Sequence, residues 1–231
     1  MMIFIENLTK KFGGVVCANI PELIINKSEL IGLVGNNGAG KTTLFRLVLD
    51  LLKSESGTVS IKGIPVNGTE DWKNYTAAYL DDGFLIDYLT ASEYFYFVGK
   101  LHGLNKQEVD DRVSSYAYFF DGGVDFKKYI RDLSKGNQFK VGIVACLLQK
   151  PELLILDEPF ANLDPSSQIR LIKILQELNI NERTTIIVSS HDLNHIAKLS
   201  TRILLMHKGE IIKDISVSTE TLDALVEYFN V

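Results

Sequence analysis

The sequence predicts an α/β fold with a mostly parallel sheet, an antiparallel β subdomain and a helical subdomain. Three observations lead to this prediction. Apolar runs at residues 30–34, 153–156 and 184–188 have the length of strands that are buried in a parallel sheet. Pairs of shorter apolar runs near both ends of the chain are typical of antiparallel hairpins. Between the two groups of strands, the pattern from about residue 85 to 150 is helical.

The N-terminal part of the chain predicts strands, one helix and a hairpin. Strands are expected at residues 3–5, 23–25 and 30–34, and a hairpin is expected to turn at Lys62-Gly63. Apolar residues recur at helical spacing at Leu44, Leu47, Val48, Leu51 and Leu52. This periodicity predicts a helix that runs to Leu52, and Gly57 follows as a stop signal.

Helix start signals divide the middle of the chain. Thr90 and Asn105 are each followed three positions later by a glutamate, which is the pattern of a capping box. A third helix is expected to begin near Ser134 and to end before Pro151. We expect this helical subdomain, about residues 85–150, to be inserted into the core.

The C-terminal part returns to strands. The runs at 153–156 and 184–188 are separated by a helix that is expected to start at Asp164-Pro165, with the aspartate as N-cap. A last hairpin is expected over residues 203–212, with its turn at Lys208-Gly209. A terminal helix is predicted by apolar residues at Leu222, Leu225, Val226 and Phe229.

Length, composition and charge limit the possible functions. A chain of 231 residues suits one α/β domain, so we expect a single domain over residues 1–231. The formal charge of −5 and the pI near 5.4 argue against nucleic acid as a partner. Cys17 and Cys146 are expected to be buried thiols in a reducing compartment rather than a disulfide.

The apolar runs are all shorter than the ~18 residues that a membrane-spanning helix needs. Residues 1–6 also lack the basic region and the cleavage site of a signal peptide. We therefore expect a cytoplasmic protein that reaches the inner face of a membrane through a partner.

The stretch from Gly35 to Thr43 has the spacing G-x-x-x-x-G-K-[ST] of a phosphate-binding P-loop, between a predicted strand and a predicted helix. Glycines let successive backbone N–H groups converge on a phosphate, and the helix dipole adds to the attraction. We expect Lys41 to pair with the β- and γ-phosphates and Thr42 to ligate Mg²⁺. A plain glycine turn is the alternative, which the combination of strand, spacing and helix disfavours. The expected nucleotide-binding residues of the loop are Asn36, Asn37, Gly38, Ala39, Gly40, Lys41, Thr42 and Thr43.

Two acids follow the apolar strand at residues 153–156. Asp157 is a carboxylate at the carboxyl end of a strand, where α/β folds place ligands, and it can hold Mg²⁺ directly or through water. The adjoining Glu158 is placed to take a proton from an attacking water. The sequence therefore predicts a P-loop NTPase core that binds a nucleoside triphosphate.

Further motifs occur in a fixed order along the chain. Leu133-Ser134-Lys135-Gly136-Asn137 precedes the two acids, Asn162-Leu163-Asp164 follows them, and Ser189-Ser190-His191-Asp192 comes at the end of a predicted strand. With the P-loop, this order resembles the ATP-binding subunit of an ABC transporter, from residue 3 to about residue 212. The P-loop and the acidic strand occur in many NTPases, whereas the serine-glycine signature upstream of the acids makes the resemblance specific.

The resemblance implies roles for residues around the nucleotide. Phe12 would stack on the adenine of ATP, and its alternative is a core phenylalanine. His191 would contact the γ-phosphate. Together with Lys41 and Glu158, it would form the catalytic set.

The resemblance also implies partners. Ser134 and Gly136 would contact the γ-phosphate held by a second ATPase subunit, so that two ATP molecules lie between two chains, identical or different. Asp164 would line the seam between them. A separate membrane permease would bind partly through the aromatic-rich stretch of residues 84–103, for which core packing is the alternative.

The chain departs from the family pattern in its signature, at Asp82 and at Ser28, where a glycine turn is common. The family usually has L-S-G-G-Q where Lys135 and Asn137 stand here, although many members of the drug and polysaccharide exporter branch resemble L-S-K-G. Asp82 stands where the family has glutamine or sometimes glutamate. Because aspartate keeps an oxygen ligand for Mg²⁺, we expect Asp82 to act through the metal when ATP is bound.

Other functions are also compatible with parts of the sequence. The main alternative is a soluble ABC-type ATPase without a membrane partner, but such relatives carry long coiled-coil inserts or paired cassettes. A non-catalytic nucleotide switch would need a lost lysine or base, and Lys41 and Glu158 are present. A zinc-protease interpretation of His191 and His195 needs both residues on one helix face, whereas His191 is expected at a strand end. The transported substrate and the direction of transport are not specified by this chain, because a permease recognises the cargo.

Overall fold

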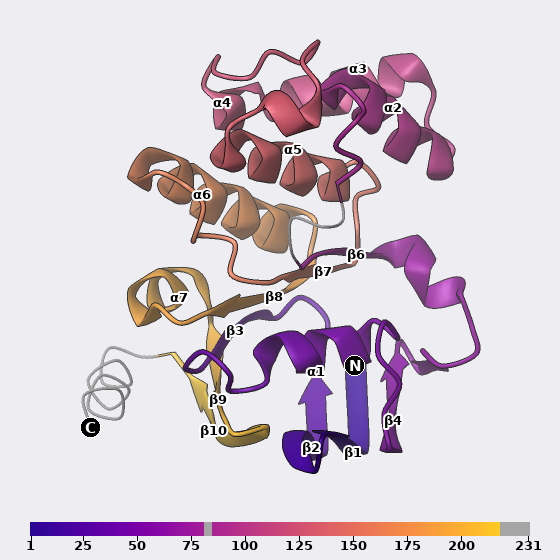
Figure 1. Ribbon diagram of the computed structural model, residues 1–231, viewed down its shortest axis with the longest axis vertical. Coiled ribbons are helices and arrows are strands. Elements are labelled where there is room, and N and C mark those ends of the chain that lie inside the picture. Colours follow the sequence, from indigo (N-terminus) through magenta and orange to yellow (C-terminus); the bar gives the residue numbers. More distant parts are fainter. Residues whose placement is uncertain (81–84, 218–231) are drawn as a thin grey trace.

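The computed structural model of this chain describes residues 1–80 and 85–217. It consists of an antiparallel sheet, a mostly parallel sheet and several helices, which are stacked in layers (Figure 1). The helices of residues 91–120 lie at one end of the long axis, and the antiparallel sheet lies at the other.

The antiparallel sheet is formed by the N-terminal part of the chain. Its strand order is β2-β1-β4-β5, with β1 at Ile3–Phe12, β2 at Val15–Ile25, β4 at Ser56–Ile61 and β5 at Ile64–Pro65. Ile3 of β1 lies opposite Ile25 on one side and Ile61 on the other, and all three side chains are buried. The pairing of β4 with β5 confirms the hairpin predicted around Lys62-Gly63.

The second sheet has the strand order β10-β9-β3-β8-β7-β6. Its strands are β3 (Leu30–Val34), β6 (Thr76–Tyr79), β7 (Leu153–Leu156), β8 (Thr185–Ser190), β9 (Arg202–His207) and β10 (Glu210–Ser216). Neighbouring strands are parallel, except that β10 pairs with β9 antiparallel through the predicted turn at Lys208-Gly209. The parallel strands place their carboxyl ends along one edge of this sheet.

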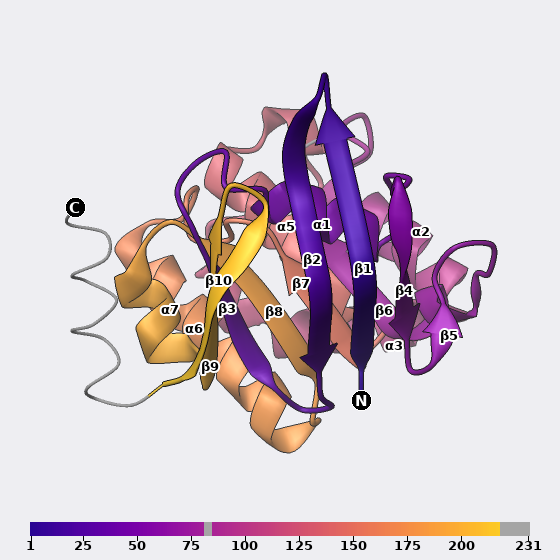
Figure 2. The same cartoon turned by 90° about the horizontal axis from the view of Figure 1, so that it is seen from below.

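The parallel strands are buried on both faces, which explains their uninterrupted apolar sequences. In β7, Leu154 and Leu156 belong to the core on the helical side, whereas Leu153 and Ile155 belong to the core that faces the antiparallel sheet. Helix α1 (Lys41–Val48) lies between the two sheets (Figure 2). The core that faces the antiparallel sheet includes four side chains of α1, those of Leu44, Phe45, Leu47 and Val48.

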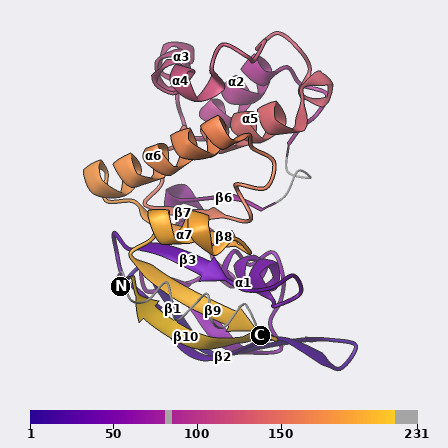
Figure 3. The same ribbon diagram turned by 90° about the vertical axis from the view of Figure 1, so that its left-hand side faces the viewer.

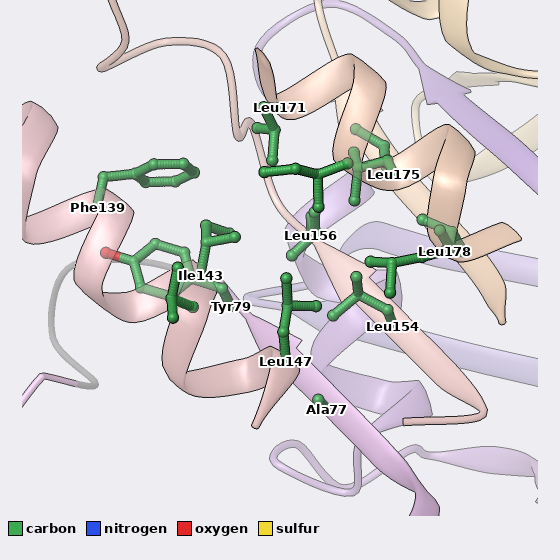
Figure 4. Close-up of a cluster of buried hydrophobic side chains, with 14 of the residues drawn as sticks. Ala77, Tyr79, Phe139, Ile143, Leu147, Leu154, Leu156, Leu171, Leu175 and Leu178 are labelled. Atoms are coloured by element: carbon green, nitrogen blue, oxygen red, sulfur yellow. The ribbon is translucent and has the colours of Figure 1, made fainter. Parts of the chain in front are cut away.

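Helices α5 (Lys135–Leu147) and α6 (Pro165–Asn181) cover the other face of the parallel sheet, and α7 (Leu193–Leu199) packs beside β3 and β8. Figure 4 shows apolar side chains of α5 and α6 meeting those of β6 and β7. The ring of Tyr79 meets the ring of Phe139 edge-on, with 4.9 Å between the centroids. The starts predicted for α5 near Ser134 and for α6 at Asp164-Pro165 are confirmed.

The outer helices are α2 (Ala91–Leu101), α3 (Lys106–Ser115) and α4 (Ala117–Phe120). They lie beyond α5, far from the antiparallel sheet (Figure 3). Both predicted capping boxes are present, at the starts of α2 and α3. Among residues 1–80 and 85–217, short 3₁₀ helices occur in the connections, η1 at Asp71–Tyr75 and η3 at Ile130–Asp132.

The predicted fold class is confirmed, but two local predictions are wrong. Helix α1 ends at Val48 and not at Leu52, because Asp50 adopts a left-handed conformation with φ of 52° and turns the chain. Leu51 is consequently 53% exposed. Gly57 lies inside β4, where a Cβ atom would come within 2.3 Å of the backbone of Asn7, so this glycine serves strand packing rather than a helix end.

The helix predicted over residues 222–229 lies outside the described residues. In the described ranges, 1–80 and 85–217, no helix combines the length and the apolar character that crossing a membrane requires.

Candidate functional site

The loop between β3 and α1 forms one wall of an open cavity of about 300 Å³. Gly38 and Gly40 have φ values of 83° and 107°, in the left-handed region that favours glycine. A Cβ atom on Gly40 would lie 2.4 Å from the carbonyl oxygen of Cys17, so a larger residue does not fit there. The cavity is lined by Cys17, Asn37, Gly38, Ala39, Gly40, Lys41, Thr42, Thr43 and Glu158. Asn36 is exposed, and its carbonyl closes the loop by accepting the N–H of Ala39 at 3.0 Å.

Lys41 begins helix α1, and its side chain is only 6% exposed. Its Nζ donates to the carbonyl oxygen of Gly35 at 2.7 Å. It also forms an ion pair with Oε1 of Glu158 at 3.2 Å. The one lysine of the P-loop is therefore held by the loop itself and by the acid that follows β7.

Asp157 directly follows β7 and is buried, with 8% exposure. Its Oδ2 accepts a hydrogen bond from Oγ1 of Thr42 at 2.5 Å, which joins the P-loop to the end of β7. Its Oδ1 accepts a short hydrogen bond from Oγ of Ser189. The hydroxyl of Thr42 and the carboxylate of Asp157 are hard oxygen donors, which Mg²⁺ prefers, so these two residues fit the predicted metal.

Glu158 lies between the side chains of Lys41 and His191. Its Oε2 is 2.9 Å from Nδ1 of His191, and its Oε1 is in the ion pair with Lys41. Its backbone has a φ of 47°, a left-handed conformation that is uncommon outside glycine. The structure thus brings all three members of the predicted catalytic set into contact.

Ser134 and Asp164 are helix N-caps, and Gly136 lies in the first turn of α5. Oγ of Ser134 accepts the N–H of Asn137 at 3.3 Å. Asp164 accepts hydrogen bonds from the hydroxyls of Ser166 and Ser167, which hold the pKa of its carboxyl well below the usual range. Within the described part of the chain, the lining of the P-loop cavity does not include Ser134 or Gly136.

Phe12 ends β1 at the tip of the β1–β2 hairpin, where it pairs with Val15. Its side chain is 50% exposed, which excludes the alternative of a core phenylalanine. The Nζ atom of Lys10 lies 5.2 Å from the centroid of its ring. An exposed aromatic ring can stack on a base.

The two histidines that resemble a zinc motif have separate surroundings. His191 follows β8 and faces Glu158, whereas His195 is on α7 with its ring 4.8 Å from that of Phe160. Over residues 1–80 and 85–217, no cluster of three or more His, Cys, Asp or Glu side chains could hold a metal ion. His195 is not an exposed surface residue of this helix, because its side chain is only 23% exposed.

Two predictions fall partly or wholly on residues that the structure does not describe. Asp82, the predicted third ligand of Mg²⁺, lies outside the described residues. The aromatic-rich stretch begins at residue 84, which is also outside them. Of its later members, Phe95 is buried in the core, whereas Tyr88 and Phe97 are 65% and 45% exposed.

Sequence reasoning missed two residues at this site. Ser189 bonds both Asp157 and the backbone of Glu158, although it was singled out only as part of the motif before His191. Cys17 also lines the cavity, with its carbonyl oxygen beside Gly40, and it lies at the bulge of the β1–β2 pairing, which no sequence signal predicted. As predicted, both cysteines are free thiols, but each is only partly buried rather than buried.

The family model for ABC transporters matches residues 19–161, which is more than half of the chain. The uncharacterized ABC transporter ATP-binding protein YhaQ of Bacillus subtilis (strain 168) is 34% identical over 212 residues, which cover 90% of this chain and 69% of that protein. The bacitracin transport ATP-binding protein BcrA of Enterococcus faecalis is 33% identical over 220 residues, which cover 92% and 68%.

Solved structures show the same fold. The structure of an ATP binding subunit of an ABC transporter has a TM-score of 0.86 and 24% identity, and the match covers 100% of this chain and 94% of that one. A dimeric ATP-binding cassette in a post-hydrolysis state, bound to ADP and Pi, has a TM-score of 0.84 and 24% identity over 94% of this chain and 99% of that one. From the family match and the relatives together, we conclude that this chain belongs to the ABC transporter family, as an ATP-binding subunit.

Proposed function

We propose that this chain hydrolyses ATP and thereby powers transport through a separate membrane permease, as one ABC-type ATPase domain over residues 1–231. The observation that supports hydrolysis best is the position of Glu158, whose carboxylate lies 3.2 Å from the lysine of the P-loop and 2.9 Å from His191. A carboxylate beside the phosphate-binding lysine is within reach of a water that attacks the γ-phosphate.

In this proposal, the backbone of the P-loop and Lys41 bind the phosphates. Phe12 stacks on the adenine. Glu158 takes the proton of the attacking water, and His191 orients Glu158 and contacts the γ-phosphate. Catalysis of this kind consists of positioning and charge stabilisation.

Thr42 and Asp157 would hold Mg²⁺, with Asp82 as a further oxygen ligand when ATP is bound. Bound Mg²⁺ neutralises charge on the β- and γ-phosphates and fixes their orientation. The hydrogen bond of 2.5 Å between Thr42 and Asp157 keeps these two oxygen donors together.

Two partners complete the proposal. Ser134 and Gly136 would meet the nucleotide of a second ATPase subunit, identical or related, with Asp164 at the seam. This agrees with their absence, in the described residues, from the lining of the chain's own P-loop cavity. The permease would place this cytoplasmic chain at the inner face of the membrane.

Hydrolysis is tested with the purified chain and Mg²⁺-ATP, by phosphate release. We expect turnover that requires Mg²⁺ and is lost in Lys41→Ala. A parent chain that binds ATP without turnover would contradict the ATPase and favour a nucleotide switch.

The permease is tested separately, with photo-cross-linkers in cells at Tyr88 and Phe97, two exposed positions at or near α2. Val15, which is 66% exposed at the tip of the distant β1–β2 hairpin, is the control position. We expect a membrane protein to be captured from the first two positions only. Capture of no membrane protein, with ATPase activity intact, would favour the soluble ABC-type ATPase.

A further inference from the structure

One buried hydroxyl touches both acids at the end of β7. Ser189 lies in β8, and its side chain is fully buried. Its Oγ accepts the backbone N–H of Glu158 at 2.8 Å and donates to Oδ1 of Asp157. A serine hydroxyl has one proton to donate and two lone pairs to accept with, so both bonds can exist together.

The pairing of β7 with β8 produces this contact. Leu156 is the register partner of Val188, so the next residues along the two parallel strands, Asp157 and Ser189, lie side by side. On its other edge, β8 pairs with β3, where Ser189 is the partner of Leu33, two residues before Gly35. The backbone of Ser189 is therefore held by strands on both sides, which places its side chain beside the acids.

We propose that Ser189 is a positioning residue that sets the geometry of Asp157 and Glu158 together; this rests on the proposed ATPase function. Each carboxylate oxygen of Asp157 accepts one hydrogen bond from a hydroxyl group, from Thr42 on one side and from Ser189 on the other. The carboxylate is thus held in one orientation before any ligand arrives. Outer residues that orient metal-binding carboxylates in this way typically matter tenfold to a hundredfold for metal affinity or activity.

The second bond of Ser189 acts on the backbone of Glu158. That residue has a left-handed φ of 47°, a conformation that persists only where neighbouring groups hold it. At this turn the backbone N–H of Glu158 donates to Oγ of Ser189. The turn directs the side chain of Glu158 to Lys41 and His191. Loss of the hydroxyl would leave a buried N–H and a buried carboxylate oxygen without this partner.

The test compares Ser189→Ala with Ser189→Thr and Thr185→Val in the full chain. Thr185 is the matched control, because it is a buried hydroxyl of the same strand that accepts a backbone N–H, from Ser28 at 2.9 Å, away from the cavity lining. Three quantities are measured: kcat and KM for ATP, the affinity of Mn²⁺ for the ADP complex by electron paramagnetic resonance, and the midpoint of thermal unfolding.

For Ser189→Ala we expect kcat to fall tenfold to a hundredfold with KM for ATP changed less than threefold, and Mn²⁺ affinity to fall about tenfold or more. Ser189→Thr, which keeps a hydroxyl, should recover at least part of both losses. Thr185→Val should keep the parent's kcat and Mn²⁺ affinity, whatever its unfolding midpoint.

Two outcomes would overturn the proposal. One is a Ser189→Ala chain with the kcat and the Mn²⁺ affinity of the parent. The other is equal losses in Ser189→Ala and Thr185→Val, which would trace the effect to the stability of β8. If the parent itself shows no turnover, the ATPase proposal fails, and the Mn²⁺ measurement still decides whether Ser189 orients Asp157.

Discussion

The edge of the parallel sheet and the outer helices are held together in different ways. At the ends of β7 and β8, a small group of side chains is connected by hydrogen bonds and an ion pair, and each side chain has a specific partner. Among α2, α4 and the segment after α4, the rings of Phe95, Phe120 and Phe126 pack edge to face, with centroids 5.0–6.3 Å apart. The first region depends on the direction of polar groups, and the second depends on the volume that apolar groups fill. Substitutions should therefore affect chemistry in the first region and stability in the second.

The largest effect is expected at the sheet edge, from Glu158→Gln. Loss of a general base typically lowers the rate by ~10²–10⁴, whereas the amide keeps the shape of the side chain. The variant should bind Mg²⁺-ATP, hydrolyse it very slowly and accumulate an ATP-bound dimer, as measured by phosphate release and size-exclusion chromatography. Glu182→Gln, at an exposed position after α6, is the control. Near-parental turnover in Glu158→Gln would remove this residue from the chemistry.

In the outer helices, Phe120→Ala should lower the free energy of unfolding by about 3–5 kcal/mol, because it leaves a cavity among buried rings. Denaturant unfolding measures this loss. ATP turnover per folded molecule should stay within about twofold of the parent. Phe97→Ala, at a position that is 45% exposed, is the control and should lose far less stability. If Phe120→Ala instead lowered turnover and left stability intact, the contrast between the two regions would be wrong.

A smaller effect is expected from Phe12→Ala, which tests binding alone. Base–aromatic stacking is worth about 1–3 kcal/mol by alanine substitution, so ATP affinity should fall about tenfold or more. Since the ring is 50% exposed, the unfolding midpoint should hardly change. Titration with ATP by calorimetry gives the dissociation constant, and Val15→Ala at the same hairpin tip is the matched control. Equal affinities in the two variants would exclude Phe12 from the adenine site.

The smallest effect concerns Tyr94 of α2 at alkaline pH. Burial raises the pKa of Tyr94 to about 12. The pKa of a tyrosine in the unfolded chain is about 10. The contribution of Tyr94 to the free energy of unfolding is therefore complete below pH 10 and is lost as the pH rises from 10 to 12. Tyr94→Phe should therefore reduce the alkaline loss of unfolding free energy, by under about 1 kcal/mol at pH 10.5. Tyr88→Phe, at a position that is 65% exposed, is the comparison. An identical pH profile for Tyr94→Phe and the parent would contradict the shift.

The parts that depend on local sequence could be predicted. The glycines of the P-loop, the caps of α2, α3, α5 and α6, and the apolar parallel strands follow from spacing and residue type. The end of α1 could not be predicted from periodicity, because Leu51 and Leu52 continue the apolar pattern while the left-handed Asp50 ends the helix.

The contacts within the site also lie beyond local reasoning. Ser189 and Asp157 are 32 residues apart and meet only through the register of β7 with β8. The ion pair of Lys41 with Glu158 likewise joins two elements that are distant in the sequence. A motif identifies such residues as a group, but only the sheet determines which atoms touch.

The ion pair between Lys41 and Glu158 makes this acid an internal competitor of the nucleotide. A phosphate that binds Lys41 must displace a carboxylate that already neutralises it at 3.2 Å. An anion of low charge gains little from this exchange, whereas a triphosphate with its metal gains more, because it also engages the backbone of the loop. In the proposed function, the same exchange would free Glu158 from its lysine when the phosphates are held. Binding of the nucleotide and release of the proposed base would then be two results of a single event.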